Sequence, residues 1–344
     1  MTGSEMSAPH VSRRSLLAAT GAAAAVITTT GARAAGALQP VTMQLGWLGG
    51  GNQLGEVAAS QLGYFAREGL ELTIVPGGPN NDGVATVASG HGEVGQVSSS
   101  PSLMLAASQD LPVRCFAVSA QKHPYAFFSL AKNPVRTVAE LKGKRVGIQA
   151  TGVVLLRALL VKNGMTLDDV KVVTIGSSMM PIMTGQVDVV TGWLTNTTAL
   201  KVLGPDRVAL RLWDAGVKLY ANPYYATPDT LAKHADTLER FLRASAKGWG
   251  YAYNNRDKAV ALLIKQYPNL VAADERAAAD VMLDYAFDQN TKQHGYGAMD
   301  PKVWQDQIDL WATLGQFAKR TPKLDEVMTL KILNATAASR PRIG

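Results

Sequence analysis

Short apolar segments alternate with helical patterns along the first part of the chain. The apolar segments have the length of buried strands, and apolar residues recur at three- and four-residue spacing between them. The predicted strands are 41–47, 70–75, 94–97 and 113–119, with helices at 56–65, 82–89 and 101–108. This alternation predicts an α/β fold in which helices cover both faces of a mostly parallel sheet.

A second set of alternating elements follows. Its predicted strands are 126–130, 145–149, 170–174, 187–191 and 208–213, joined by helices at 152–163, 179–184 and 195–203. Residues 88–95 resemble residues 183–190, since each segment combines a helix end, a glycine suited to positive φ, an acidic residue and a buried strand. We therefore expect two similar lobes.

After about residue 226 the pattern becomes mostly helical. Helices are predicted at 238–253, 258–266, 274–287 and 302–317. Because this part lacks the strands for a sheet of its own, we expect it to pack back onto the first lobe. Lobe 1 would then comprise residues 35–124 and 225–344, and lobe 2 residues 125–224. Crossings near 121–125 and 219–225 would act as hinges that let the lobes close.

The N-terminal residues have the order of an export signal. Arg13 and Arg14 precede a weakly apolar run, and Ala32-Arg33-Ala34 supplies small residues for a signal peptidase. The run is too short and too poor in large apolar residues to span a bilayer. Residues 1–34 are thus predicted to be a cleaved twin-arginine signal peptide, with an ordinary basic tail as the alternative. The mature chain is expected to be soluble in the periplasm and not inserted in the membrane.

Composition and charge narrow the class of protein. A hydrophobic content of 47% is typical of a globular chain. Cys115 is the single cysteine, which excludes an intrachain disulfide, and its apolar surroundings indicate core packing. The leader accounts for +2 of the net charge of +7, which leaves about +5. Since the basic residues are scattered and no aromatic–basic motif is present, nucleic acid is not an expected partner.

Several motifs together resemble a known family. Residues 59–72 have the form A-x-x-x-G-Y-F-x-x-E-G-L-x-L, and residues 138–147 read VAELKGKRVG. Lys247-Gly248-Trp249 and Gly297-Ala298-Met299-Asp300 add later matches. These segments are similar to the periplasmic solute-binding proteins for nitrate, sulfonates and thiamine-precursor pyrimidines. The resemblance implies a type II periplasmic binding protein, two-lobed, with the ligand in the cleft between the lobes.

Candidate binding residues follow from the same architecture, because ligands sit beyond the carboxyl ends of strands, where helix N-termini converge. The first loop offers Trp47, Asn52 and Gln53. The Trp47 indole could lie against an aromatic or apolar ligand, or it could close the core. The pyrimidine-binding members carry a histidine where Gln53 stands.

The second loop contains Ser98 and Ser99, whose hydroxyls and amides would face the cleft. Ser100 is expected to be the N-cap of a helix that begins with Pro101.

The second lobe offers a matching set of residues. Thr151 and Gly152 enter a helix, and Thr151 is either a cap or a ligand contact. Trp193 and Asn196 follow the next strand, and Trp193 could oppose Trp47 across the cleft. The pyrimidine-binding members place a glutamate after the second-lobe asparagine, where this chain has threonines instead, so groups suited to an aminopyrimidine are missing. Tyr224 is either hinge packing or a cleft wall.

No enzyme signature accompanies these residues. The histidines have no metal-ligand spacing, and no nucleophile elbow, phosphate loop or dinucleotide fingerprint is present. The sequence therefore predicts a monomeric, non-enzymatic protein without a cofactor, the substrate-binding component of an ABC importer with a permease and an ATPase as partners. Its solute would be a small aromatic or alkyl compound with an anionic group. The alternatives are a receptor for a membrane sensor and a pyrimidine-synthesis-type enzyme.

Overall fold

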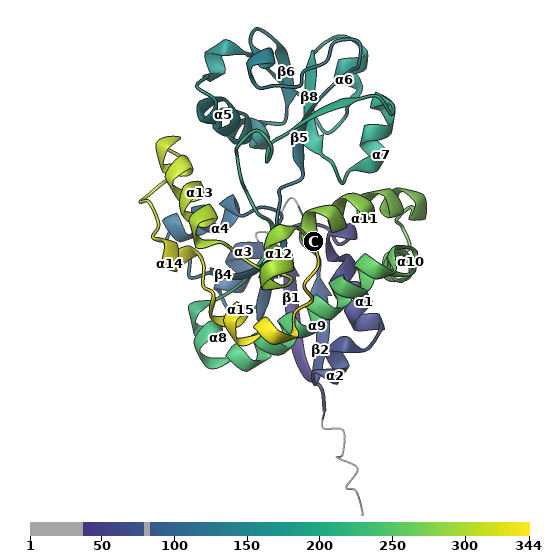
Figure 1. The fold of residues 1–344 in the computed structure, drawn as a ribbon. Helices are drawn as coiled ribbons and strands as arrows, with labels where there is room; N and C mark the ends of the chain where they lie inside the picture. The colour runs from purple at the N-terminus through teal and green to yellow at the C-terminus, as the bar shows by residue number, and fades with distance from the viewer. Residues whose placement is uncertain (1–36, 79–82) are drawn as a thin grey trace, which may run out of the picture. The chain divides into compact units, whose positions relative to one another are not determined.

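Two five-stranded sheets organise the described part of the chain, residues 37–78 and 83–344 of a computed structural model (Figure 1). The predicted leader, 1–34, lies outside the described residues. Ala37–Gly344 forms one compact unit. The predicted α/β class is confirmed, and both sheets are mixed, since each combines parallel and antiparallel pairs.

The first sheet has the order β2-β1-β3-β10-β4. Its strands are β1 (Gln39–Leu45), β2 (Leu70–Val75), β3 (Val94–Gln96), β4 (Arg114–Ala120) and β10 (Ala221–Ala226). β1 is parallel to β2 and β3, whereas β10 is antiparallel to β3 and β4. The parallel strands end at one edge, which brings the loops after β1 and β3 together.

The second sheet has the order β7-β6-β8-β5-β9. Its strands are β5 (Tyr125–Ser129), β6 (Arg145–Ile148), β7 (Lys171–Thr174), β8 (Val189–Trp193) and β9 (Val208–Arg211). Phe127 and Phe128 are neighbours on β5 but belong to different clusters of buried residues. Because successive side chains of a strand point to opposite faces, both faces of this sheet are covered.

Helices follow the strands as the pattern predicts. Those of the first sheet are α1 (Leu54–Gln61), α2 (Tyr64–Arg67), α3 (Gly83–Ala88) and α4 (Pro101–Ser108). Those of the second are α5 (Val153–Lys162), α6 (Met180–Met183) and α7 (Thr197–Leu200). One long helix was predicted where α1 and α2 stand. Gly63, with φ of 71°, separates them because a left-handed residue ends the helix.

The C-terminal part is helical. It comprises α8 (Pro228–Lys233), α9 (Ala235–Asn254), α10 (Arg256–Gln266), α11 (Ala272–Ala286), α12 (Gln289–His294), α13 (Pro301–Thr313), α14 (Leu324–Val327) and α15 (Lys331–Ala335). Its backbone bonds to β4, since Val118 N donates to the Gly297 carbonyl at 3.1 Å and Thr329 N to the Cys115 carbonyl at 2.9 Å. Cys115 is fully buried, as expected for core packing.

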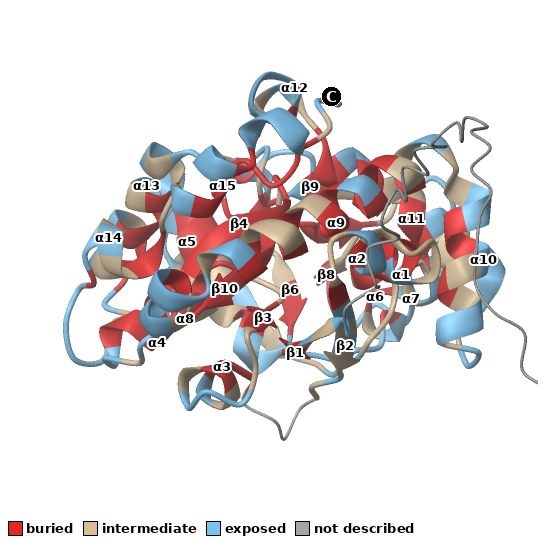
Figure 2. Cartoon of the chain, turned by 90° about the horizontal axis from the view of Figure 1, so that it is seen from below, coloured by how far each residue is buried: buried red, intermediate tan, exposed pale blue. Residues whose placement is uncertain are grey.

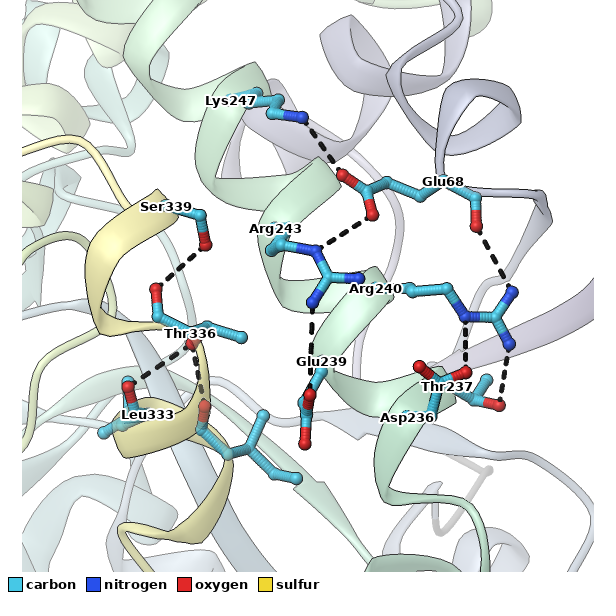
Figure 3. Close-up of polar contacts among 11 residues, drawn as sticks. Glu68, Asp236, Thr237, Glu239, Arg240, Arg243, Lys247, Leu333, Thr336 and Ser339 are labelled. Atoms are coloured by element: carbon cyan, nitrogen blue, oxygen red, sulfur yellow. Dashed lines mark hydrogen bonds and ion pairs between the residues drawn. The ribbon is translucent and has the colours of Figure 1, made fainter.

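α9 packs tightly on α1. A Cβ on Gly248 would lie 2.0 Å from the Gly55 carbonyl oxygen, so only glycine permits this approach. On the same helix, Arg243 and Lys247 both bond to the carboxylate of Glu68 (Figure 3). Figure 2 shows β4, β10 and much of α9 buried in the interior.

The strand β10 corrects one expectation, because 219–225 was interpreted as a hinge crossing. Ala221–Ala226 instead lies between β3 and β4. Pro223 makes such a central position hard to predict, since proline cannot donate to a ladder. The strand is irregular nearby, with a shift of register between Tyr224 and Tyr225 and with Asn222 at φ of 49°. The chain thus rejoins the first sheet by Ala221, before the predicted boundary at 224/225.

No helix of the described residues is both long and apolar enough to cross a lipid bilayer.

Candidate functional site

A cavity of about 260 Å³ is lined by residues of the second sheet, of the loop and helix that follow β3, and of the C-terminal part. Of the predicted binding residues, Ser99, Thr151, Gly152 and Trp193 line it. Other lining residues are His123, Tyr125, Gln149, Trp311 and Gln316, together with Pro101, Ser102, Leu105, Val154 and Leu155. None of these lining residues is Asp, Glu, Lys or Arg, so the wall is uncharged, and four of its side chains are aromatic rings: His123, Tyr125, Trp193 and Trp311.

The first-sheet side of the cavity is formed where β3 leads into α4. Ser99 is half-buried, and Pro101 takes the first position of the helix as predicted. Ser100 stands at the N-cap position, but its hydroxyl makes no capping bond. It donates instead to Gln307 Oε1 at 2.5 Å and accepts from Tyr220 N at 3.2 Å, so it anchors this loop to α13 and to the segment before β10.

The second-sheet side is formed by the turn between β6 and α5. Thr151 and Gly152 belong to a single 3-10 turn, Ala150–Gly152, in which Thr151 is exposed and Gly152 is buried. A Cβ on Gly152 would lie 2.6 Å from the Tyr125 hydroxyl. A glycine here therefore lets the turn approach the tyrosine that forms the adjacent wall.

Three rings form the aromatic wall of the cavity. The ring centroids of His123 and Trp193 are 4.7 Å apart with an interplanar angle of 47°. Tyr125 meets Trp193 edge-on, with centroids 6.3 Å apart at 89°. Tyr125 and Trp193 are direct neighbours across β5 and β8, which fixes their spacing.

His123 is the most informative member of this wall. The ring is fully buried, and neither ring nitrogen has a hydrogen-bond partner among the described residues. Burial lowers the pKa of His123 to about 3, so the imidazole is neutral at physiological pH. A neutral imidazole has one donor and one acceptor, and leaving both unpaired in the interior is costly.

His123 and Gln149 were not among the predicted binding residues. His123 precedes Pro124 in the first crossing, 121–125, and that position was the signal available from the sequence. Trp311 of α13 and Gln316 just beyond it reach the cavity through the packing of the C-terminal helices, which no local pattern reveals.

The remaining predicted residues lie outside this cavity. Trp47 is 51% exposed, and Asn52 and Ser98 are half-buried. Asn196 is exposed and accepts from Ala199 N at 3.4 Å as the N-cap of α7. The stacking of Trp47 and Trp193 on opposite sides of a ligand stays a prediction.

Gln53 and Tyr224 belong to a buried polar network centred on Glu56. Gln53 Nε2 donates to Gln96 Oε1 at 2.6 Å, and Gln96 Nε2 donates to Glu56 Oε1 at 3.3 Å. The Tyr224 hydroxyl donates to the same carboxylate oxygen and lies 2.9 Å from the Tyr296 hydroxyl. Burial raises the pKa of Glu56 to about 7, and the bond from Tyr224 only partly opposes this. These side chains therefore have internal partners.

Within residues 37–78 and 83–344, no group of three or more His, Cys, Asp or Glu side chains is placed to hold a metal ion.

Comparison with known proteins finds that this chain is similar to both binding proteins and enzymes. A family model described as NMT1/THI5 like matches residues 51–259. The riboflavin-binding protein RibY of Chloroflexus aurantiacus is 28% identical over 78% of each chain. A formylaminopyrimidine-binding protein of Halalkalibacterium halodurans is 27% identical over 79% of this chain and 84% of that protein. Enzymes also match: a 4-amino-5-hydroxymethyl-2-methylpyrimidine phosphate synthase of Schizosaccharomyces pombe is 26% identical over 54% of this chain and 58% of that protein.

Among solved structures, the periplasmic aliphatic sulphonate binding protein of Escherichia coli superposes with a TM-score of 0.66. The match covers 84% of this chain and 91% of that chain at 16% identity, so it speaks to the fold alone. The described residues thus have the two-lobed α/β fold of periplasmic binding proteins, as the resemblance in the sequence implied.

Proposed function

The chain belongs to the NMT1/THI5-like family, and from that premise we propose that it is the solute-binding component of an ABC importer. It captures a small organic solute in the periplasm and delivers it to a membrane permease, while a partner ATPase supplies the energy. The observation that carries this proposal is the uncharged, aromatic cavity to which the ends of β3, β6 and β8 all contribute. Ligand sites of open α/β sheets occupy this position.

The lining indicates the kind of solute. An engineered apolar cavity of about 150 Å³ holds benzene, so about 260 Å³ has room for more than one small ring or for a short alkyl compound. Trp193 and Tyr125 offer ring faces and edges, and Ser99, Thr151 and Gln149 offer polar groups. The expected anionic group stays a prediction, and the lining offers it no lysine or arginine.

Binding would couple to closure of the two lobes. Ser99 reaches the cavity from the loop after β3 and Trp311 from α13, whereas Thr151 reaches it from the turn after β6 and Trp193 from β8. A solute that contacts both sets stabilises the closed arrangement, because only that arrangement makes all of the contacts. The crossings at 121–124 and just before Ala221 are the proposed hinges, and the permease would recognise the closed surface.

The proposed role also includes export of the folded chain and a monomeric state. Residues 1–34 would direct the folded chain through the twin-arginine route and then be removed, leaving a monomer. Replacing Arg13 and Arg14 by lysine is expected to keep the protein in the cytoplasm, as cell fractionation would reveal. Secretion of that variant at the wild-type level would exclude the twin-arginine route.

The solute-binding role is tested with residues 35–344 and a ligand panel taken from the relatives: riboflavin, formylaminopyrimidine and alkanesulfonates. A ligand at 100 times its Kd adds about 2.7 kcal/mol to the free energy of unfolding, which a thermal shift detects.

Isothermal titration of Trp193→Ala and Trp47→Ala then locates the site. We expect at least a tenfold loss of affinity, about 1.4 kcal/mol, for Trp193→Ala only. An equal loss in Trp47→Ala would extend the site to the first loop, and unchanged affinity in Trp193→Ala would exclude the cavity.

The enzyme alternative predicts that the bound compound is converted. Recovery of the ligand unchanged after long incubation supports a receptor, whereas a new product would overturn it. The resemblance implies a cysteine cluster for the pyrimidine-forming enzymes, and this chain has Cys115 alone, buried in β4.

A further inference from the structure

A second cavity, of about 380 Å³, lies among the C-terminal helices and shares no lining residue with the first. Its walls come from α12, the start of α13, α15 and the segment after α15. Two arginines, Arg340 and Arg342, line it together with the amide side chains of Gln293 and Asn334. Asp300 is the one carboxylate among the lining residues, so the cavity has an excess of positive charge.

Arg340 is held rigidly in the wall of this cavity. The residue is only 6% exposed. One terminal nitrogen of its guanidinium donates to the Tyr296 carbonyl, and the other donates to the Leu333 carbonyl at 3.1 Å. The Nε atom is buried and has no partner among the described residues.

The turn before Arg340 is itself fixed by side-chain bonds (Figure 3). The Thr336 hydroxyl donates to the Ile332 carbonyl at 2.7 Å, and the Ser339 hydroxyl donates to the Thr336 carbonyl at 2.9 Å. The guanidinium is therefore preorganised, and little side-chain entropy would be lost when it binds a partner.

The buried charge of Arg340 makes no ion pair within the part of the chain that the structure describes. Among the described residues, no carboxylate forms an ion pair with Arg340 or Arg342. Burial and repulsion from Arg342 lower the pKa of Arg340 to about 10, which leaves it charged at neutral pH. Asp300 Oδ1 accepts from Lys302 N at 2.8 Å as the N-cap of α13, and its carboxylate is not paired with either arginine. A buried charge without a partner is costly, and an anion in the cavity would offset that cost.

We infer that this cavity is a binding site for a small oxyanion, such as phosphate or a short carboxylate, held by Arg340 and Arg342. Guanidinium groups bind oxyanions through paired N–H donors and are preferred over lysine for this geometry. Asn334 and Gln293, both exposed at the cavity, can donate from their amide groups. The site does not depend on the solute cavity and would bind its anion whether or not that cavity is filled.

The test uses residues 35–344 and inorganic phosphate as the probe, with citrate in a parallel series and sodium chloride matching the ionic strength. We expect phosphate or citrate to raise the Tm of the wild type more than that of Arg342→Gln, because the general stabilisation by kosmotropic anions is common to both proteins. Isothermal titration should show binding at least about tenfold weaker in Arg342→Gln, which loses one charged donor group. Arg342 is exposed, so this variant is expected to fold normally.

Arg136→Gln is the matched control, because Arg136 is exposed, lies outside both cavities and carries the same charge. It should bind the anion as the wild type does. A second variant, Arg340→Lys, keeps the charge but loses the forked geometry, and circular dichroism checks its fold. An equal rise in Tm in the wild type and Arg342→Gln, or equal affinity in Arg342→Gln and Arg136→Gln, would overturn the inference.

Discussion

At the scale of single residues, two buried titratable groups change the stability of the folded protein with pH in opposite directions. The pKa of Glu56 is about 7 in the folded protein against the ordinary 4.5 of a glutamate, so the folded state holds an extra proton between these pH values. The contribution of Glu56 to the free energy of unfolding thus falls by roughly 3 kcal/mol as pH rises from about 4.5 to 7. The pKa of His123 is about 3 against 6.5, so its unfolded form binds the proton. Stability from His123 is lost as pH falls from about 6.5 to 3, by roughly 5 kcal/mol.

The two effects should nearly cancel between about pH 4.5 and 6.5, and single variants should separate them. Glu56→Gln is expected to lose stability on acidification relative to the wild type, whereas His123→Phe should lose stability as pH rises. Urea unfolding across this interval measures both slopes. Parallel curves for the wild type and the variants would contradict the assignment of these groups as the dominant pair.

His123→Phe also tests whether the His123 ring only packs in the cavity wall or also binds the solute. Phenylalanine keeps a ring beside Trp193 but removes two nitrogens without partners, so the free energy of unfolding at pH 8 should rise by about 1–3 kcal/mol. If the solute bonds to the imidazole, affinity should fall in the same variant by about tenfold. Higher stability with unchanged affinity would assign the ring to the wall alone.

At the scale of elements, the junction of α1 and α9 depends on a close approach at Gly248. A Cβ there would lie 2.0 Å from a backbone oxygen, which cannot rotate away. Gly248→Ala should therefore destabilise the protein by more than about 2 kcal/mol despite its better helix propensity. Gly250→Ala on the same helix is the control, because the nearest atom is a Pro341 side-chain carbon at 3.2 Å. Equal denaturation midpoints for the two variants would contradict this account of the junction.

The elements also show what the sequence could and could not reveal. Strands such as β1 and β5 follow from apolar runs of the right length, and α4 follows from Pro101 at its first position. β10 was missed because Pro223 has no N–H to donate and so contradicts the local signature of a central strand. Its place is fixed by β3 and β4 on either side, which are distant in sequence.

The candidate site also combines residues that could be predicted from the sequence with residues that could not. Loops at strand ends were predictable, which is why Ser99, Thr151, Gly152 and Trp193 were chosen and line one cavity. His123 was not, because its role depends on being buried beside Trp193 with no partner, a property of packing. Gln53 and Tyr224 were predicted at the ligand, but their polar atoms are hydrogen-bonded within the Glu56 network.

At the scale of the whole molecule, Asp274 links α11 of the C-terminal part to the second-sheet side of the chain. It accepts hydrogen bonds from Thr198 at 2.5 Å and from Lys201, and its backbone carbonyl accepts from Thr197 at 2.9 Å. Bonding to Lys201 is the main reason that the pKa of Asp274 is lowered. These contacts join the two halves of the proposed closing motion through residues that do not line the solute cavity.

Asp274→Asn should therefore weaken closure without touching the solute. The amide cannot form the ion pair with Lys201, so the closed arrangement loses population. The apparent affinity for the solute falls by the same factor as the closed fraction. Small-angle scattering should show a larger radius of gyration without ligand and a normal one at saturation. Asp257→Asn is the control, since it breaks an ion pair with Arg276 between neighbouring C-terminal helices. If both variants scatter and bind alike, the Asp274 contacts do not govern closure, and the hinge crossings alone would have to set the balance between open and closed forms.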